Sequence, residues 1–451
     1  MKNAEINEKT SMFLLAGPIF FELLLNILLN NVDTVMLSRY SDTAVGAVGN
    51  SNQMMMMFII MCNIIASATG VVVSQYLGAK KLEDMNTIYS MAVLINIALG
   101  MCLSLLMFLF AGTFMNLLNV DALQLQDAVD YTRWVGGFLF LQAGYNVMIQ
   151  ILRCHGYTRT GLFISLIVNG INIFGNWLFL YGPLKYLELG VTGVAISTVV
   201  ARFVALTVAL VIFFRFRIGK ISIRYLKPFQ WGIFTKMLRV GIPSAGENLA
   251  YNIYQLVLLS YINRMGAISA NAKVYANTLM SFSVVFSNSM AQATMIVTGH
   301  LVGAGKEDEA DLRVRRTLRT ALPVAVIIAA ANYFSCPLTL LVFTQNVEEI
   351  HLVQQILRVG ILMEIGRTTN LVCINSMKAA GDVLFPVLIG MATMWVVGIG
   401  VGYSCGVALS LGVAGVFAGT MADECLRGLI IYVRWRSGSW RGKAMVKLQN
   451  R

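Results

Sequence analysis

The chain has 451 residues, of which 57% are hydrophobic and 12% are charged. A soluble domain carries about 25% charged residues, so the composition excludes an ordinary soluble protein. The formal net charge of +12 does not indicate nucleic-acid binding, because the basic residues lie in short connections between long apolar runs. We therefore predict an all-α, multi-pass protein of the lipid bilayer.

Twelve apolar runs follow one another along the chain, each approaching or exceeding the ~20 residues that span a bilayer. They are residues 12–37, 50–77, 88–111, 132–152, 160–181, 190–214, 238–262, 274–302, 319–343, 356–377, 384–405 and 410–433. The first is too long for a cleavable signal peptide. Roughly 25 basic residues fall in the connections and tail on one side and about four on the other, which predicts that both termini are cytoplasmic. We expect the chain to lie in the cytoplasmic (inner) membrane.

The two halves of the chain repeat each other. Pro18 and Pro243 are separated along the chain by the same offset as Glu22 and Glu247 (243 − 18 = 247 − 22). A constant offset of this kind indicates an internal repeat. The same offset joins a further set of residues: Asn52 to Asn277, Gly78 to Gly303, Arg153 to Lys378 and Gly156 to Gly381.

The repeat predicts two six-helix lobes of the same orientation, related by a pseudo-two-fold along the membrane normal. We place the N-lobe at residues 1–226 and the C-lobe, with a basic cytoplasmic tail, at residues 227–451. The connection at about 215–236 is the linker between the lobes.

The first predicted helix carries polar residues that are costly in lipid. Pro18 should bend it, because proline removes a backbone donor. Glu22 and its repeat mate Glu247 lie near the bilayer midplane, so we assign them to a central substrate cavity that attracts organic cations. Asn26 and Tyr251 are assigned to the same cavity. The alternative, that each glutamate is only a structural acid, stays open.

Asp33 lies about three turns farther along the same helix and has no acidic repeat mate, because residue 258 is a leucine. Asn172 and Asn176 are four residues apart and share one face of the fifth helix. Together with Asp33 they could bind a hard monovalent cation or form a proton relay. The N-lobe is therefore the predicted ion-handling half.

The remaining charges within spans are expected to neutralise one another. Glu364 and Arg367 are three residues apart in the tenth helix, a spacing that permits pairing. Asp423, Glu424 and Arg427 in the last helix invite the same interpretation. An interhelical Arg202–Glu424 pair is a further possibility.

No motif of an enzyme is present. The sequence lacks a Walker loop, a dinucleotide fingerprint, a zinc-protease motif and a nucleophile elbow. We expect neither catalysis nor a cofactor other than a coupling ion. A membrane enzyme remains a weaker alternative, which turnover without a gradient would revive.

Several segments together resemble the multidrug and toxic compound extrusion (MATE) family. They are Pro18 with NNVDTVMLSRYSDTAVGAVGN, SQYLGAKK, LRCHGYTR and LGVTGVAISTVVAR in the first half, and GIP, HLVGAGKEDEA, MKAAGD and LGVAGV in the second. The aspartate fifteen residues after the proline is the most specific element. The resemblance covers about residues 12 to 434 and implies a twelve-helix antiporter that exchanges Na⁺ or H⁺ for organic compounds.

The resemblance also implies roles for single residues. Pro18 is similar to the family's first-helix proline, whose bending is linked to protonation, and Asp33 to the N-lobe coupling aspartate. Asn172 and Thr198 resemble its partners in the fifth and sixth helices. Asn176 stands where many members have an aspartate, which removes one charge and leaves the choice between H⁺ and Na⁺ open.

We therefore expect a monomeric secondary antiporter that exports organic, cationic and amphipathic compounds by rocking its lobes, with no nucleic-acid partner. In some Na⁺-coupled members an acidic residue stands where this chain has Arg367, which argues against a cation site in the C-lobe. The alternative is a flippase for a lipid-linked saccharide of the same superfamily. A flippase would need a cationic cavity to hold a pyrophosphate. Arg367 is the residue that favours this alternative.

Overall fold

The computed structural model describes residues 10–341 and 344–446. The last two residues of the predicted span 319–343, the outermost N-terminal residues of the predicted N-lobe and the end of the predicted basic tail lie outside these ranges. Within them the chain is helical and contains no strand.

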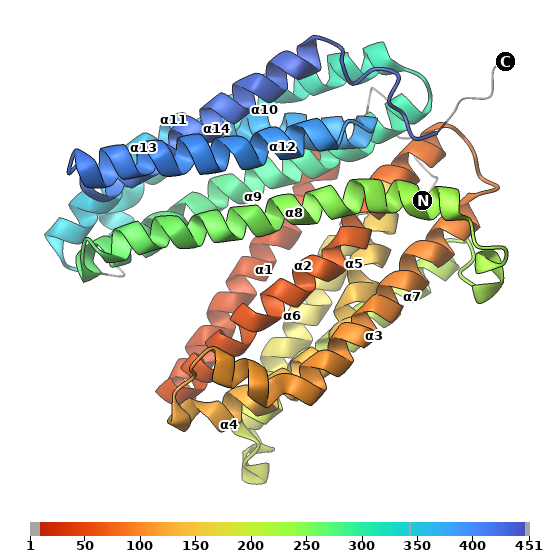
Figure 1. Cartoon of the computed structure of the whole chain (residues 1–451). Helices are drawn as coiled ribbons and strands as arrows, with labels where there is room; N and C mark the ends of the chain where they lie inside the picture. The colour runs from red at the N-terminus through yellow and green to blue at the C-terminus, as the bar shows by residue number, and fades with distance from the viewer. Residues whose placement is uncertain (1–9, 342–343, 447–451) are drawn as a thin grey trace. The chain divides into compact units, whose positions relative to one another are not determined.

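The helices follow one another in the order labelled in Figure 1. They are α1 (Met12–Tyr40), α2 (Asp42–Gly78), α3 (Met85–Leu117), α4 (Ala122–Tyr131), η1 (Thr132–Gly136), α5 (Leu139–Cys154), α6 (Thr158–Leu180), η2 (Lys185–Leu187), α7 (Gly190–Arg215), η3 (Ile223–Leu226), α8 (Trp231–Asn263), α9 (Ala267–Gly303), α10 (Glu307–Leu340), α11 (Val347–Ala380), α12 (Leu384–Thr393), η4 (Met394–Gly398), α13 (Ile399–Tyr403), η5 (Ser404–Ala408) and α14 (Gly412–Arg436).

Each predicted span coincides with one helical segment of the described chain, and most segments extend past the apolar run. The fourth segment consists of α4, η1 and α5 and bends by 45°. The eleventh, from α12 to η5, contains two short π-helical stretches. By length and composition alone, seven described helices, or eight segments with the bent pair, are apolar enough to span. Among the others, α11 and α14 carry buried charges, and α9 is rich in Ser, Thr and Asn.

The chain divides into two compact units. The first contains residues 21–77 and 81–241, and the second contains residues 10–20, 78–80 and the described residues from 242 onward. Helix α1 therefore begins in the second unit and continues in the first, and α8 begins in the first and continues in the second. Pro18 and Pro243 each lie within three residues of these changes. A proline weakens the helix locally, so both connections are points of reduced stiffness.

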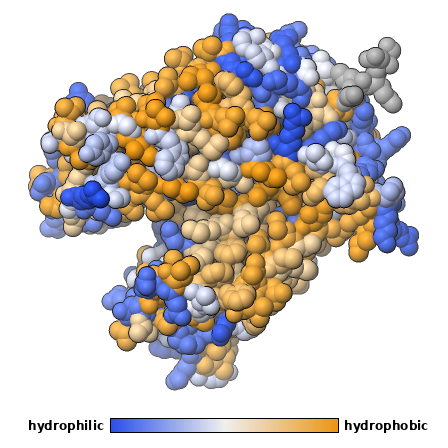
Figure 2. All heavy atoms as spheres, in the orientation of Figure 1, coloured by the Kyte–Doolittle hydropathy of each residue, from blue (hydrophilic) through white to orange (hydrophobic). Residues whose placement is uncertain are grey.

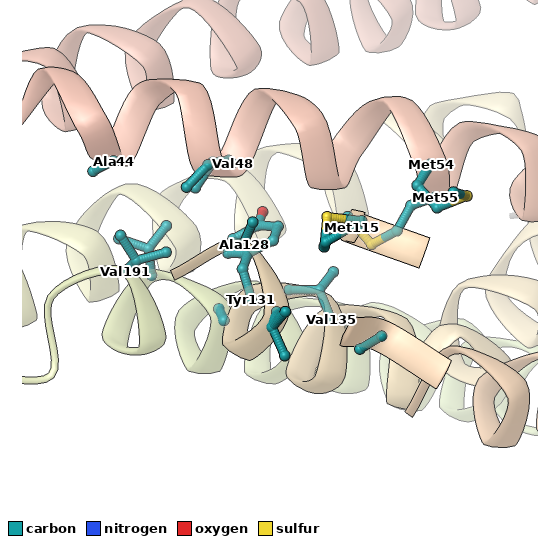
Figure 3. Close-up of a cluster of buried hydrophobic side chains, with 14 of the residues drawn as sticks. Ala44, Val48, Met54, Met55, Met115, Ala128, Tyr131, Val135 and Val191 are labelled. Atoms are coloured by element: carbon teal, nitrogen blue, oxygen red, sulfur yellow. The ribbon is translucent and has the colours of Figure 1, made fainter. Parts of the chain in front are cut away.

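Methionines and small residues fill the core of the first unit. Figure 3 shows Met54, Met55, Met115, Tyr131 and their neighbours packed between α2, α3, α4 and α7. Met54 and Met55 are buried, whereas the next two methionines of the same run are more than half exposed. Such alternation along α2 follows from the helical period and gives one face to the core and one to the outside.

Large apolar side chains also cover much of the outer surface, as the orange atoms in Figure 2 show. Phe108, Phe163, Phe203 and Leu429 are each more than half exposed. A soluble protein rarely exposes contiguous patches of this kind, whereas a bilayer is their natural surrounding.

The polypeptide after α14 folds back onto the second unit. The rings of Trp435 and Trp440 stack with centroids 4.2 Å apart, and Trp435 Nε1 donates to Asp311 at 3.0 Å. Lys443 Nζ lies 2.8 Å from Asp382 in the turn between α11 and α12. At least this part of the predicted basic tail is thus a packed segment.

Candidate functional site

Four predicted residues of the N-lobe lie in one chain of hydrogen bonds. Asn176 Nδ2 donates to Asp33 Oδ1 at 2.8 Å and to Asn172 Oδ1 at 3.2 Å. Asn172 Nδ2 in turn donates to Thr198 Oγ1 at 3.1 Å. The chain joins α1, α6 and α7 inside the first unit. We call Asp33, Asn172, Asn176 and Thr198 the Asp33 cluster.

Close packing of α6 on α7 positions this cluster. A Cβ on Gly175 would lie only 2.5 Å from Ser197 Oγ, and a Cβ on Gly193 would lie 2.6 Å from the Phe179 side chain. Glycine at these two positions lets the helix backbones approach. Asn172 and Asn176, one turn apart, then both face α7 and α1 and are almost fully buried.

The electrostatic environment of Asp33 is unusual for a carboxylate in a membrane span. Among the residues that the structure describes, it has no ion-pair partner, and its hydrogen bond comes from a neutral amide. Asn176 Oδ1 is buried and has no hydrogen-bond partner among them. A buried acceptor without a partner is rare, because burial removes its hydrogen bonds to water. The cluster therefore combines one negative charge with several neutral oxygens.

Two residues near this cluster were not assigned to it from the sequence. Tyr131, at the end of α4, is close enough to both Asp33 and Arg202 to interact with them electrostatically. Arg202 Nη1 approaches the carbonyl of Val135 at 3.4 Å. Glu424 contacts Arg427 in the other unit at 3.0 Å. The Arg202–Glu424 pair stays a prediction, because the two residues belong to different units. Arg202 could have been noticed in the sequence, because an arginine inside an apolar run is costly in lipid and indicates a functional neighbourhood.

Glu22 is held by a basic residue of its own unit. Arg153 Nη2 lies 2.8 Å from Glu22 Oε2, and the two side chains are only 9% and 5% exposed. Gly161 of α6 faces the same carboxylate, since a Cβ there would lie 2.4 Å from Glu22 Oε2. The predicted fourth span ended at residue 152, whereas Arg153 lies in the last turn of α5 and is buried.

The second repeat contains the matching pair. Lys378 Nζ lies 2.7 Å from Glu247 Oε2, and these two residues are the repeat mates of Arg153 and Glu22. Both acids are therefore neutralised within their units, which corrects the expectation that they present free negative charge to a substrate. The physical reason is that an unpaired buried carboxylate is far more costly than a paired one.

The other two residues assigned to the substrate cavity are more exposed. Asn26 Oδ1 accepts a hydrogen bond from Ser165 at 3.3 Å, and the Tyr251 side chain is 38% exposed and contacts the Tyr254 ring. Their role in substrate binding stays a prediction.

The C-lobe contains a network of buried charges. Arg367 Nη1 lies 2.5 Å from Glu364 Oε1, which confirms that expected pair. Arg427 Nη2 lies 3.0 Å from both Asp423 and Glu424, which confirms the second. Asn370 also donates to Glu424 at 2.9 Å. Each of the three acids is thus in contact with an arginine.

The repeat mate of Asp33 in the C-lobe is Leu258, an apolar residue with apolar neighbours. Leu258 is 3% exposed and belongs to the buried core of the second unit. The two repeats therefore differ at this position in charge and in packing.

Comparison with known proteins gives a consistent result. The profile of the MatE family matches this chain twice, at residues 18–178 and again at residues 243–404. The two matches begin at the repeat-related prolines, and together they cover more than half of the chain.

The relatives extend over nearly the whole length. An uncharacterized transporter of Bacillus subtilis is 34% identical over 96% of both chains. A probable multidrug resistance protein of Thermotoga maritima is 24% identical, with 96% of this chain and 93% of that protein covered.

The fold is also found in solved structures. An outward-facing multidrug resistance MATE family transporter superposes with a TM-score of 0.89 at 20% identity, covering 97% of this chain and 98% of that one. A MATE protein in its straight conformation gives a TM-score of 0.88. The all-α membrane fold of twelve helices in two lobes is thereby confirmed.

Proposed function

Because the chain belongs to the multidrug and toxic compound extrusion family, we propose that it is a secondary antiporter that exports organic, cationic and amphipathic compounds in exchange for H⁺ or Na⁺. The observation that supports this best is the Asp33 cluster. There a carboxylate within a membrane span is hydrogen-bonded to a neutral amide and has no ion-pair partner among the described residues. We also propose that the transporter is monomeric, with both termini in the cytoplasm.

Asp33 would act as the reloadable charge. With a proton or Na⁺ bound, the carboxylate is neutralised, and the hydrogen bond from Asn176 competes with the new ligand for its oxygens. Such a change favours one arrangement of α1, the helix that carries Pro18 and runs from one unit into the other. Exchange requires that ion and substrate either compete or prefer different conformations of the transporter.

Both ions remain candidates for this cluster. Na⁺ prefers oxygen ligands, and Asp33, Asn172, Asn176 and Thr198 supply carboxylate, amide and hydroxyl oxygens around one charge. A proton would need only Asp33 and a path to water. The single negative charge fits a monovalent ion in either case.

Transport in proteoliposomes tests the proposal. A pH gradient and a Na⁺ gradient are imposed separately, and efflux of an organic cation is compared with that of a neutral and an anionic compound. Asp33→Asn should fold normally and lose gradient-driven efflux. Asp42→Asn removes an exposed carboxylate at the start of α2 and serves as the matched control. Normal efflux by Asp33→Asn would overturn the assignment of the coupling site.

The flippase alternative loses support from the charges of the C-lobe. Arg367 is in contact with Glu364 at 2.5 Å and lies 3.8 Å from Glu424, so its charge is already balanced. A pyrophosphate would have to displace both carboxylates. Movement of a lipid-linked saccharide between leaflets by the purified protein, without efflux of organic cations, would favour this alternative instead.

A further inference from the structure

A groove of about 420 Å³ lies on the second unit between α10, α11 and α14. Its charged end is formed by Arg315, Arg319 and Arg436, and its apolar wall includes Leu322, Ile365 and Leu429. The groove shares no residue with the Asp33 cluster, the glutamate ion pairs or the predicted substrate cavity. We call it the α10–α14 groove.

Glycines make the floor of this groove. A Cβ on Gly366 of α11 would lie 2.5 Å from the backbone nitrogen of Cys425, and a Cβ on Gly428 of α14 would lie 2.7 Å from the Gly366 carbonyl oxygen. The two helices therefore touch through their backbones. Gly366 and Gly428 also line the groove, where a glycine adds no side chain to fill it.

The charges at the groove are not balanced. Arg315 is held by an ion pair with Asp311. Arg319 and Arg436 are exposed, and neither has an ion-pair or hydrogen-bond partner within the described part of the chain. Two arginines with free guanidinium groups thus stand at one end of an otherwise apolar hollow. Guanidinium groups bind phosphate with paired hydrogen bonds.

The polar and apolar ends are separated along the helix axis. Arg436 is the last residue of α14, and Leu429 lies seven residues earlier, which corresponds to about 10 Å of helix. Leu429 is 60% exposed and Ile365 is 43% exposed. A ligand that fits must therefore carry its negative charge near the end of α14 and an apolar chain directed deeper into the membrane.

We propose that the α10–α14 groove binds an anionic phospholipid, with its headgroup phosphate between Arg319 and Arg436 and one acyl chain along Leu322, Ile365 and Leu429. The complementary charge, together with the apolar wall beside it, selects a lipid over a soluble anion. Basic pockets between transmembrane helices bind anionic headgroups in this manner, and each arginine near such a surface contributes about fivefold in affinity.

The experiment uses the full chain in detergent with a photoactivatable phosphatidylglycerol that carries its reactive group in the acyl chain. Phosphatidylcholine with the same reactive chain is the zwitterionic comparison. The variants are Arg319→Gln, Arg436→Gln, their combination, and Thr369→Phe, which fills the groove without a change of charge. Arg316→Gln, an exposed arginine of α10 outside the groove, is the matched control. Size-exclusion profiles show which variants remain folded.

Phosphatidylglycerol should label peptides of α10, α11 and α14. Labelling should fall about fivefold for each groove arginine replaced and reach background in the double variant, while Arg316→Gln labels like the parent protein. Thr369→Phe should also reduce labelling. Equal labelling by phosphatidylcholine, or equal loss in Arg316→Gln, would overturn the proposal. So would displacement by glycerol phosphate at the same concentration, which would indicate a site for free phosphate.

Discussion

The two repeats carry the same buried ion pair but differ at a second acidic position. Glu22 pairs with Arg153 in the first unit, and their repeat mates Glu247 and Lys378 pair in the second. Asp33 has a buried leucine as its repeat mate. A feature that both repeats share is explained by folding, because each repeat must solve the same packing problem. A feature of one repeat alone is the better candidate for a directional function.

The comparison also separates two kinds of buried charge. The paired glutamates, like the acids of the C-lobe network, have a basic neighbour that neutralises them. Asp33 has amide and hydroxyl neighbours instead. A neutralised carboxylate has little to gain from a coupling ion, whereas an acid with neutral partners gains its missing counter-charge from one.

The largest effect is expected when the first repeat is made like the second. Asp33→Leu should reduce gradient-driven efflux in proteoliposomes to the level of empty vesicles, because the reloadable charge is lost. Adding Leu258→Asp should not restore transport, since that position lies in an apolar core. Efflux in the double variant at the parent rate would show that the difference between the lobes is not functional.

Breaking the shared pair should affect stability rather than coupling. Arg153→Met leaves Glu22 buried without a partner and should lower the free energy of unfolding in detergent by about 3–5 kcal/mol. The double variant Glu22→Met/Arg153→Met should recover most of that loss. Lys378→Met should have a somewhat smaller effect, because the second pair is 13–14% exposed and the first 5–9%. An equal loss in the single and double variants would argue against a direct ion pair.

A smaller effect is expected from the neutral partners of Asp33. Asn176→Ala removes the hydrogen bond to the carboxylate, and a bond to a charged group contributes about 1.5–3 kcal/mol. The half-saturating concentration of the coupling ion should therefore shift about tenfold or more. Asn169→Ala, on the same helix but outside the hydrogen bonds of the Asp33 cluster, is the control. An unchanged ion dependence would place the coupling site elsewhere.

The smallest effect concerns two repeat-related turns, one between α5 and α6 and one between α11 and α12. Each turn contacts the chain near the end of the last helix of its repeat. In the first unit Tyr157 stacks on Phe216 at 4.9 Å, whereas its repeat mate Asp382 pairs with Arg434 and Lys443. Asp382→Asn should lower stability by about 1 kcal/mol, and less in high salt, because its partners are partly exposed.

Tyr157→Ala should instead be insensitive to salt, since stacking is not ionic. Thermal unfolding in low and high salt measures both variants. The same salt dependence in both would contradict the distinction between the two turns.

Much of this protein follows from the sequence alone. Apolar runs of spanning length give the twelve helices, and the constant offset between the halves gives the two repeats. These are local or periodic properties, so they can be read without coordinates. The polar neighbours of Asp33 were also accessible, because the spacing of Asn172 and Asn176 places them on one helix face and the resemblance supplied Thr198.

Only the tertiary structure decided which charges meet. Glu22 lies on α1 and Arg153 on α5, and Glu247 and Lys378 likewise lie on separate helices, so no local pattern predicts that they pair. Arg202 of α7 lies near Tyr131 of α4, which the sequence did not predict either. The groove between α10 and α14 exists only where glycines of separate helices meet. Pairing and cavities depend on how helices pack, and packing is set by all contacting side chains together.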